Sequence, residues 1–124
     1  MENQNKAILF VDDEEEILDI LVDFFSDEGY NLYTARKAEE AIQILDKTDV
    51  DFVLSDLKLP DASGSELLNQ VRVKNPDTVR VLTSGYLDIK YGNICENRQD
   101  GTLYLSKPWD LSTLKKLVLD KLGQ

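Results

Sequence analysis

Residues 6–29 read KAILFVDDEEEILDILVDFFSDEG, and this stretch predicts a buried strand followed at once by a helix. The run 6–11 is apolar without polar alternation, which is typical of a strand covered on both faces, as in a parallel sheet. Beyond the acidic residues, apolar side chains recur at helical spacing over 17–25, and Gly29 supplies a helix stop. The stretch therefore predicts a strand that ends in two aspartates and leads directly into a helix.

The same alternation of strand and helix continues to the end of the chain. Further strands are predicted over 30–35, 51–55, 78–83 and 102–106, and further helices over 38–45, 67–75, 86–98 and 111–122. The helix over 86–98 is the least stable by composition, because Gly92, Asn93 and Asn97 are poor helix formers. Strands that alternate with helices predict an α/β fold, a doubly wound (βα)5 unit with a five-stranded parallel sheet.

Length and charge limit the domain count and the class of partner. At 124 residues the chain is predicted to form a single domain over 1–124, with its core at about 6–122 and no output domain. The formal net charge of −10 disfavours direct binding to nucleic acid or to an anionic membrane surface. The absence of histidine excludes His-based catalysis, and the lone Cys95 cannot form an internal disulfide. The polar start, without a leader or an apolar span, predicts a cytoplasmic location.

Reactive side chains stand where the predicted strands end: Asp12 and Asp13, then Asp56, Ser84 and Lys107. Ligands of open parallel sheets bind outside the carboxyl ends of the strands, so these residues are expected to converge. A carboxylate cluster without His or Cys favours a hard cation such as Mg²⁺, which retains water and phosphate oxygens as ligands. Carboxylates also attack phosphoryl groups. The sequence therefore predicts a site for a metal ion and a phosphoryl group.

Each of these signals also has an ordinary structural explanation. Acidic residues at a helix N-terminus stabilise the helix dipole, and a single aspartate after a strand is commonly a turn residue. A phosphatase of the haloacid dehalogenase type would need an aspartate two positions after Asp56, where Lys58 stands. The spacing of a calcium-binding loop is absent from 12–16. The convergence of several strand ends, rather than any one residue, carries the prediction of a site.

Four motifs make the chain resemble, over 6–122, the receiver domain of bacterial two-component response regulators. The motifs are FVDDE at 10–14, LSDLKLPDASG at 54–64, LTSGY at 82–86 and YLSKPWD at 104–110. The resemblance implies the flavodoxin-like strand order 2-1-3-4-5. It also implies that Asp56 accepts a phosphoryl group from a sensor histidine kinase or a phosphotransfer protein. Asp13, Asp56 and the backbone carbonyl of Lys58 would bind Mg²⁺ directly, and Asp12 would act through water.

The resemblance further assigns roles around the phosphoryl group. Ser84 and Lys107 would contact its oxygens, and the rotamer of Tyr104 would follow Ser84. Lys58 and Tyr86 would flank the path of the hydrolytic water and slow the loss of the phosphoryl group. Phosphorylation is expected to change the face formed by the helix over 86–98, the strand over 102–106 and the final helix. An output domain, a partner protein or a second copy of the domain would recognise that face.

The resulting hypothesis is a phosphorelay switch, which is not a metabolic enzyme and promotes only its own phosphorylation and dephosphorylation. The alternative is a degenerate receiver that is never phosphorylated and serves only as a protein-interaction module. The mark of such a module is the loss of a site residue, and none is lost in this sequence.

Overall fold

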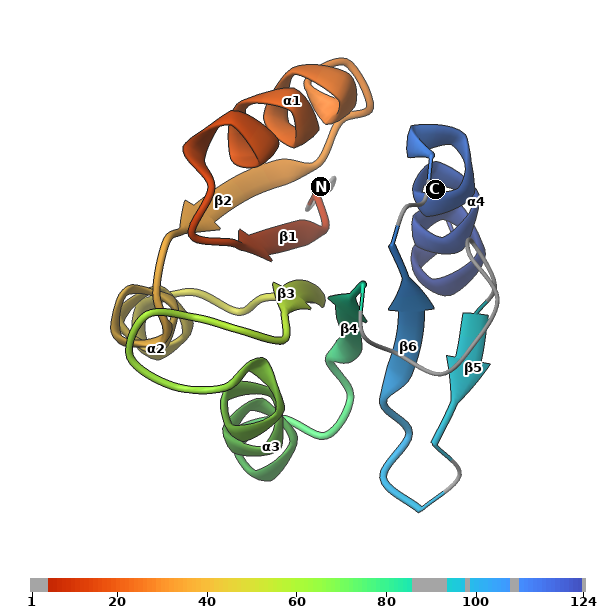
Figure 1. Cartoon of the computed structure of the whole chain (residues 1–124). Coiled ribbons are helices and arrows are strands. Elements are labelled where there is room, and N and C mark those ends of the chain that lie inside the picture. The colour runs from red at the N-terminus through yellow and green to blue at the C-terminus, as the bar shows by residue number, and fades with distance from the viewer. Residues whose placement is uncertain (1–4, 86–93, 98, 108–109, 124) are drawn as a thin grey trace.

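In the part of the chain that the structure describes, a six-stranded sheet lies between two pairs of helices (Figure 1). The computed structural model describes residues 5–85, 94–97, 99–107 and 110–123. The strands are β1 (Ala7–Val11), β2 (Asn31–Ala35), β3 (Phe52–Asp56), β4 (Val79–Ser84), β5 (Ile94–Glu96) and β6 (Leu103–Ser106). The helices are α1 (Glu15–Phe25), α2 (Ala38–Lys47), α3 (Gly64–Lys74) and α4 (Leu111–Leu122). Among the described residues, no helix combines the length and the apolar character needed to cross a membrane.

The five strands expected from the sequence are present and parallel. The order in the sheet is β2-β1-β3-β4-β6-β5, so the five parallel strands follow the expected 2-1-3-4-5 arrangement, with β6 as the fifth of them. The register aligns their carboxyl ends, because Val11 pairs with Ser55, and Asp56 pairs with Thr83. The predicted fold class is therefore confirmed, and with it the edge of the sheet at which strand-end side chains meet.

The prediction of a helix over 86–98 is wrong for the last part of this range. Ile94–Glu96 form β5, which pairs antiparallel with β6 and adds an unpredicted edge strand to the sheet, while residues 86–93 lie outside the described residues. The two strands are joined by a turn in which Asn97 N donates to Thr102 O at 2.8 Å, and Gly101 adopts a φ of 80°. A left-handed residue suits glycine and ends the strand in a hairpin. Pairing with the open edge of β6 therefore outweighs the weak helical pattern.

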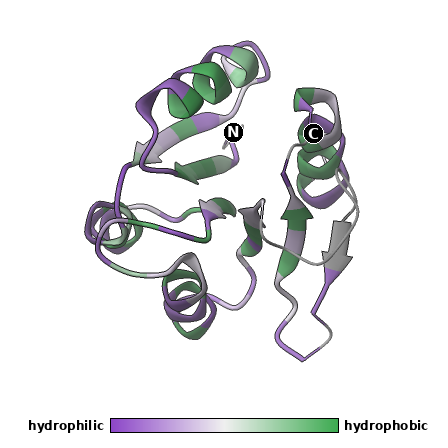
Figure 2. Ribbon diagram, in the orientation of Figure 1, coloured by the Kyte–Doolittle hydropathy of each residue, from purple (hydrophilic) through white to green (hydrophobic). Residues whose placement is uncertain are grey.

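The core consists of two apolar layers, one on each face of the sheet (Figure 2). On one face α1 and α4 cover the sheet, and the rings of Phe10 and Phe25 lie 5.7 Å apart between β1 and α1. On the other face α2 and α3 cover Leu9, Val53 and Leu82. Because all five residues of β1 are buried, the unbroken apolar run in the sequence is explained by helices on both sides of the strand.

Candidate functional site

Three carboxylates gather at the carboxyl ends of β1 and β3. Asp12 and Asp13 follow the last residue of β1, and Asp56 is the last residue of β3. Each of the three offers a carboxylate oxygen, and these oxygens all lie within 4.8 Å of one another. The closeness follows from the parallel register, since the neighbouring strands β1 and β3 end at the same level. The structure thus brings together the acidic residues that the sequence predicted to converge.

Asp12 is the buried member of the cluster, with 5% of its surface exposed. Its Oδ1 accepts a hydrogen bond from Glu14 N at 2.9 Å, which holds the carboxylate over the start of α1. Burial raises the pKa of Asp12 above its ordinary value, and the hydrogen bond from Glu14 and the charge of Lys107 only partly offset this effect. The ionised form of Asp12 would therefore be stabilised by a further positive charge, such as that of a metal ion.

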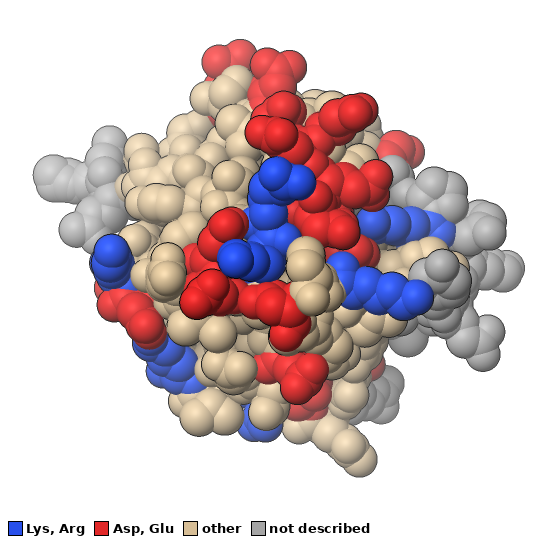
Figure 3. Space-filling model, turned by 60° about the vertical axis from the view of Figure 1, so that its left-hand side comes forward, with Lys and Arg blue, Asp and Glu red and all other residues tan. Residues whose placement is uncertain are grey.

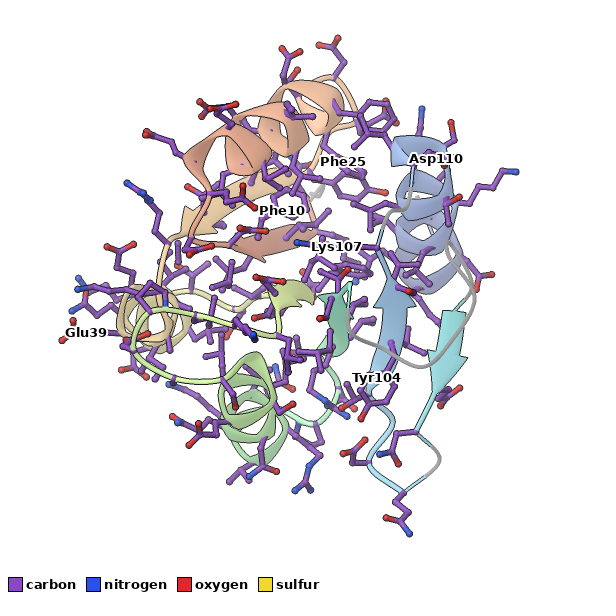
Figure 4. All side chains as sticks on the ribbon, viewed as in Figure 1. Phe10, Phe25, Glu39, Tyr104, Lys107 and Asp110 are labelled. Carbon is purple, nitrogen blue, oxygen red and sulfur yellow. The ribbon has the colours of Figure 1, made fainter. Side chains whose placement is uncertain are left out.

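Lys107 supplies a positive charge to two of these carboxylates. Its Nζ lies 3.3 Å from Asp56 Oδ1 and 3.7 Å from Asp12 Oδ2. The backbone of Lys107 is positioned by its N–H, which donates to Ser84 O at 3.0 Å just beyond the paired ends of β4 and β6. Figure 4 shows the lysine reaching from the end of β6 across to the ends of β1 and β3. One ammonium group facing two carboxylates leaves a net negative site.

The donor chemistry of the cluster fits Mg²⁺. All three side chains offer carboxylate oxygens, which are the ligands that this hard cation prefers, and no sulfur or imidazole lies among them. Asp13 is exposed and Asp56 is partly exposed, so water and a phosphoryl group can reach the cluster. The backbone carbonyl of Lys58, which is also expected to bind the ion, lies in the loop that follows Asp56. Its role as a metal ligand stays a prediction.

A close backbone contact holds α3 beneath the phosphoacceptor candidate. Gly64 begins α3, and its N–H donates to Leu57 O at 2.7 Å. A Cβ at this position would lie 2.1 Å from Asp56 O, 2.8 Å from Leu82 Cδ1 and 2.9 Å from Ser55 Oγ. Only a residue without a side chain fits so close to the strand. The glycine in the motif at 54–64 is thereby explained by packing against the end of β3.

The remaining predicted residues occupy several places. Ser84 ends β4 and is buried, next to the strand that carries Asp56. Tyr104 lies on β6, is partly buried, and its hydroxyl accepts a hydrogen bond from Asn97 Nδ2 at 3.4 Å. Tyr104 therefore contacts the hairpin that replaces the end of the expected helix (Figure 4). Tyr86 lies outside the described residues.

Two residues without a predicted role also lie beside the site. Arg36 Nη2 donates to the backbone carbonyl of Asp13 at 3.1 Å. Asp61, in the loop after Asp56, accepts hydrogen bonds from the backbone N–H groups that begin α2. The sequence held one signal for the contact of Asp61 with α2. Lys37 occupies the N-cap of this helix and is a residue type that does not cap helices, so the first N–H groups need an acceptor from elsewhere in the chain.

The charge on one face of the molecule favours the binding of a cation. Figure 3 shows acidic side chains spread over one face of the molecule, with a few lysine and arginine side chains set among them.

A cavity of about 300 Å³ lies away from the carboxylates, between α2 and α3. Its lining includes Val50 and Thr78, which precede β3 and β4. That cavity is at the amino ends of the strands, opposite the carboxylates, so it takes no part in chemistry at Asp56.

Comparison with known proteins agrees with this geometry. The family described as the response regulator receiver domain matches residues 8–119. Sporulation initiation phosphotransferase F of Bacillus subtilis is 30% identical over 115 residues, which cover 92% of this chain and 91% of that protein. The hydrogenase transcriptional regulatory protein HoxA of Cupriavidus necator is 33% identical over 109 residues, which cover 88% of this chain but 22% of that protein.

A solved structure shares both the fold and the sequence pattern. It is the signal receiver domain of an HD domain-containing protein from Pseudomonas fluorescens Pf-5, with a TM-score of 0.81 and 32% identity over 99% of this chain and 90% of that one. The match of the family to nearly the whole chain, on a fold whose carboxylates meet at the strand ends, establishes the relationship. The chain therefore belongs to the response regulator receiver domain family of two-component phosphorelay signalling.

Proposed function

We propose that this chain is a phosphoacceptor switch in which Asp56 takes a phosphoryl group from the phosphohistidine of a sensor histidine kinase or a phosphotransfer protein. The observation that carries the proposal is the position of Asp56. Its carboxylate shares the cluster with Asp12 and Asp13, it faces Lys107 at 3.3 Å, and 17% of its side chain is exposed. A carboxylate that is reachable and stands beside both a cation site and an ammonium group is suited to receive a phosphoryl group.

The transfer needs little covalent chemistry from the protein. An oxygen of Asp56 attacks phosphorus, the bond from phosphorus to the donor's imidazole nitrogen breaks, and the electron pair stays with the imidazole, which then takes up a proton. Lys107 and Ser84 contact the phosphoryl oxygens and stabilise their charge. Asp13, Asp56 and the backbone carbonyl of Lys58 would hold Mg²⁺ directly, and Asp12 would hold it through water; when bound, the ion would supply positive charge to the phosphoryl oxygens. The phosphoryl acceptor is the protein itself, so the chain is a switch rather than a metabolic enzyme.

The signal leaves through the face that carries Tyr104. Ser84 and Tyr104 belong to the neighbouring strands β4 and β6, and Tyr104 contacts Asn97 of the hairpin. Movement of the Ser84 hydroxyl toward a phosphoryl group gives Tyr104 room to follow, and the hairpin then shifts with it. The output surface is formed by the β5–β6 hairpin and α4, in which Ile94–Glu96 form a strand in place of the last part of the helix expected over 86–98. A partner protein, an output domain or a second copy of the chain reads it.

The setting of the switch follows from its charge and size. The proposed unit is a single domain over 1–124 that acts in the cytoplasm. A net charge of −10 disfavours direct contact with nucleic acid or membranes. The alternative of an interaction module that is never phosphorylated has no feature of the described site in its favour, since Asp56 and Lys107 are both in place.

The decisive experiment is phosphorylation by a small phosphodonor. Incubation with phosphoramidate and Mg²⁺ should add one phosphoryl group to the wild-type chain by intact mass, and Asp56→Asn should add none. Asp120→Asn, an exposed aspartate on α4, is the matched control and should be labelled like the wild type. Unchanged labelling of Asp56→Asn would place the phosphoryl group elsewhere. An unlabelled wild-type chain would favour the interaction module.

A further inference from the structure

Helix α2 begins without a capping side chain of its own. Lys37 occupies the N-cap position with extended backbone angles and makes no side-chain cap. The missing acceptor comes from a residue more than 20 positions away in the chain: Asp61 Oδ1 accepts from Ala38 N at 2.8 Å, and Asp61 Oδ2 accepts from Glu39 N at 3.0 Å. Both oxygens of one carboxylate are therefore used on the first turn of the helix, where the dipole favours negative charge.

Asp61 lies at the tip of the loop that follows the phosphoacceptor. Leu59 N donates to Ala62 O at 3.1 Å, which closes a tight turn around Pro60 and Asp61. Below the turn, Lys58 pairs with Ser63 in an antiparallel bridge. The loop is thus a short hairpin that starts at Asp56 and carries Lys58. The carboxylate of Asp61 is what ties its outer end to another element.

The connection between β2 and α2 also contacts a second loop of the site, the one that carries Asp13. Arg36, two residues before Ala38, donates from Nη2 to the carbonyl of Asp13 at 3.1 Å. The short stretch 36–39 therefore contacts the loop of Asp13 with a side chain and the loop of Lys58 with backbone N–H groups. These two loops carry proposed metal ligands, and their relative position decides whether the ligands fit one cation.

We propose that Asp61 is a positioning residue for phosphoryl transfer, which holds the Lys58 loop at the distance from the Asp13 loop that Mg²⁺ binding requires. This inference rests on the proposed function, because it concerns the same metal and phosphoryl site. The ordinary alternative is that Asp61 only stabilises α2. The two differ in one respect: a cap can be replaced locally at Lys37, whereas the tether to the loop cannot.

The test uses four variants of the full chain, of which one is a control. Asp61→Ala removes both the cap and the tether. The double variant Asp61→Ala/Lys37→Ser places a capping hydroxyl at the N-cap itself and keeps the net charge of the wild type, because one acidic and one basic residue are lost together. Asp61→Asn keeps one acceptor oxygen for the helix and serves as a milder change. Lys37→Ser alone is the control for the loss of the exposed Lys37–Glu39 ion pair.

The proposal predicts that a new helix cap restores the stability of the variant but does not restore its affinity for Mg²⁺. Asp61→Ala should melt at a lower temperature than the wild type, and the double variant should recover most of that loss. The Kd for Mg²⁺, measured by calorimetry, should rise about tenfold in Asp61→Ala and stay raised in the double variant, as for other residues that orient metal ligands. The labelling rate with phosphoramidate should follow the Kd. Recovery of Mg²⁺ affinity in the double variant, or an unchanged Kd in Asp61→Ala, would overturn the proposal.

Hydrogen exchange of the metal-free protein separates this inference from the proposed function. The Leu59 amide, which closes the turn, should be protected in the wild type and exchange faster in both Asp61→Ala and the double variant. This result needs neither Mg²⁺ nor phosphorylation, so the tether can be tested even where labelling fails. Equal protection of Leu59 in the wild type and the double variant would show that Asp61 acts on the helix alone.

Discussion

Replacing Gly64 with alanine tests whether α3 packs against the phosphoacceptor strand as closely as described. The new Cβ would lie 2.1 Å from Asp56 O, well inside ordinary van der Waals contact. The oxygen is a backbone atom at the end of β3, so the methyl group cannot be accommodated by rotating a side chain. Either the start of α3 or the end of β3 must move.

The expected cost follows from this geometry. Overpacking a well-packed interior costs about 1–3 kcal/mol, and a contact this short with a backbone atom belongs at the upper end. Alanine regains a little through its lower conformational entropy in the unfolded chain, about 0.4–1 kcal/mol. We therefore expect Gly64→Ala to lower the free energy of unfolding by about 2–3 kcal/mol, which corresponds to a melting temperature lower by roughly 6–12 °C for a domain of this size.

Urea unfolding followed by circular dichroism measures the change directly. Gly85→Ala is the matched control, because a Cβ at Gly85 meets no atom of the described residues within 4 Å, and its stability should stay within about 1 kcal/mol of the wild type. Gly64→Ala should also be labelled more slowly by phosphoramidate, since the end of β3 carries Asp56. A loss of stability below about 1 kcal/mol in Gly64→Ala, with the urea dependence unchanged, would refute the close approach.

Three further outcomes are expected. Burial raises the pKa of Asp12 above its ordinary 3.8, so the folded apo protein loses stability as the pH rises through that raised pKa. Asp12→Asn should therefore melt at a higher temperature than the wild type at neutral pH, and its melting temperature should depend less on pH. Equal pH dependence of the two melting temperatures would contradict this. Mg²⁺ at about 100 times its Kd should stabilise the wild type by about 2.7 kcal/mol in thermal melts, and Asp13→Ala should lose this response. Lys58→Ala and Tyr86→Ala should each shorten the lifetime of the phosphoryl group, followed by intact mass, and a lifetime equal to the wild type would remove the shielding role.

The strand and helix pattern and the strand-end chemistry were predictable because both are local. An apolar run such as 6–11 indicates a strand with two covered faces, and the residue that follows it in a parallel sheet must lie at the ligand-binding edge. The amino-acid sequence alone therefore places Asp12, Asp13 and Asp56 together, and their oxygens do lie within 4.8 Å of one another. The same reasoning places Ser84 and Lys107 at neighbouring strand ends, where the backbone N–H of Lys107 donates to Ser84 O.

Tertiary structure alone decided the edge of the sheet and the contacts that brace the site. The apolar spacing over 86–98 favours a helix, yet Ile94–Glu96 pair with β6, because an open strand edge offers backbone hydrogen bonds that no local pattern records. The cap of α2 by Asp61 joins residues that are 23 positions apart, and Gly64 owes its identity to a neighbouring strand. Periodicity encodes which face of an element is buried. It does not encode which distant backbone groups will need a partner, because that depends on how the elements pack.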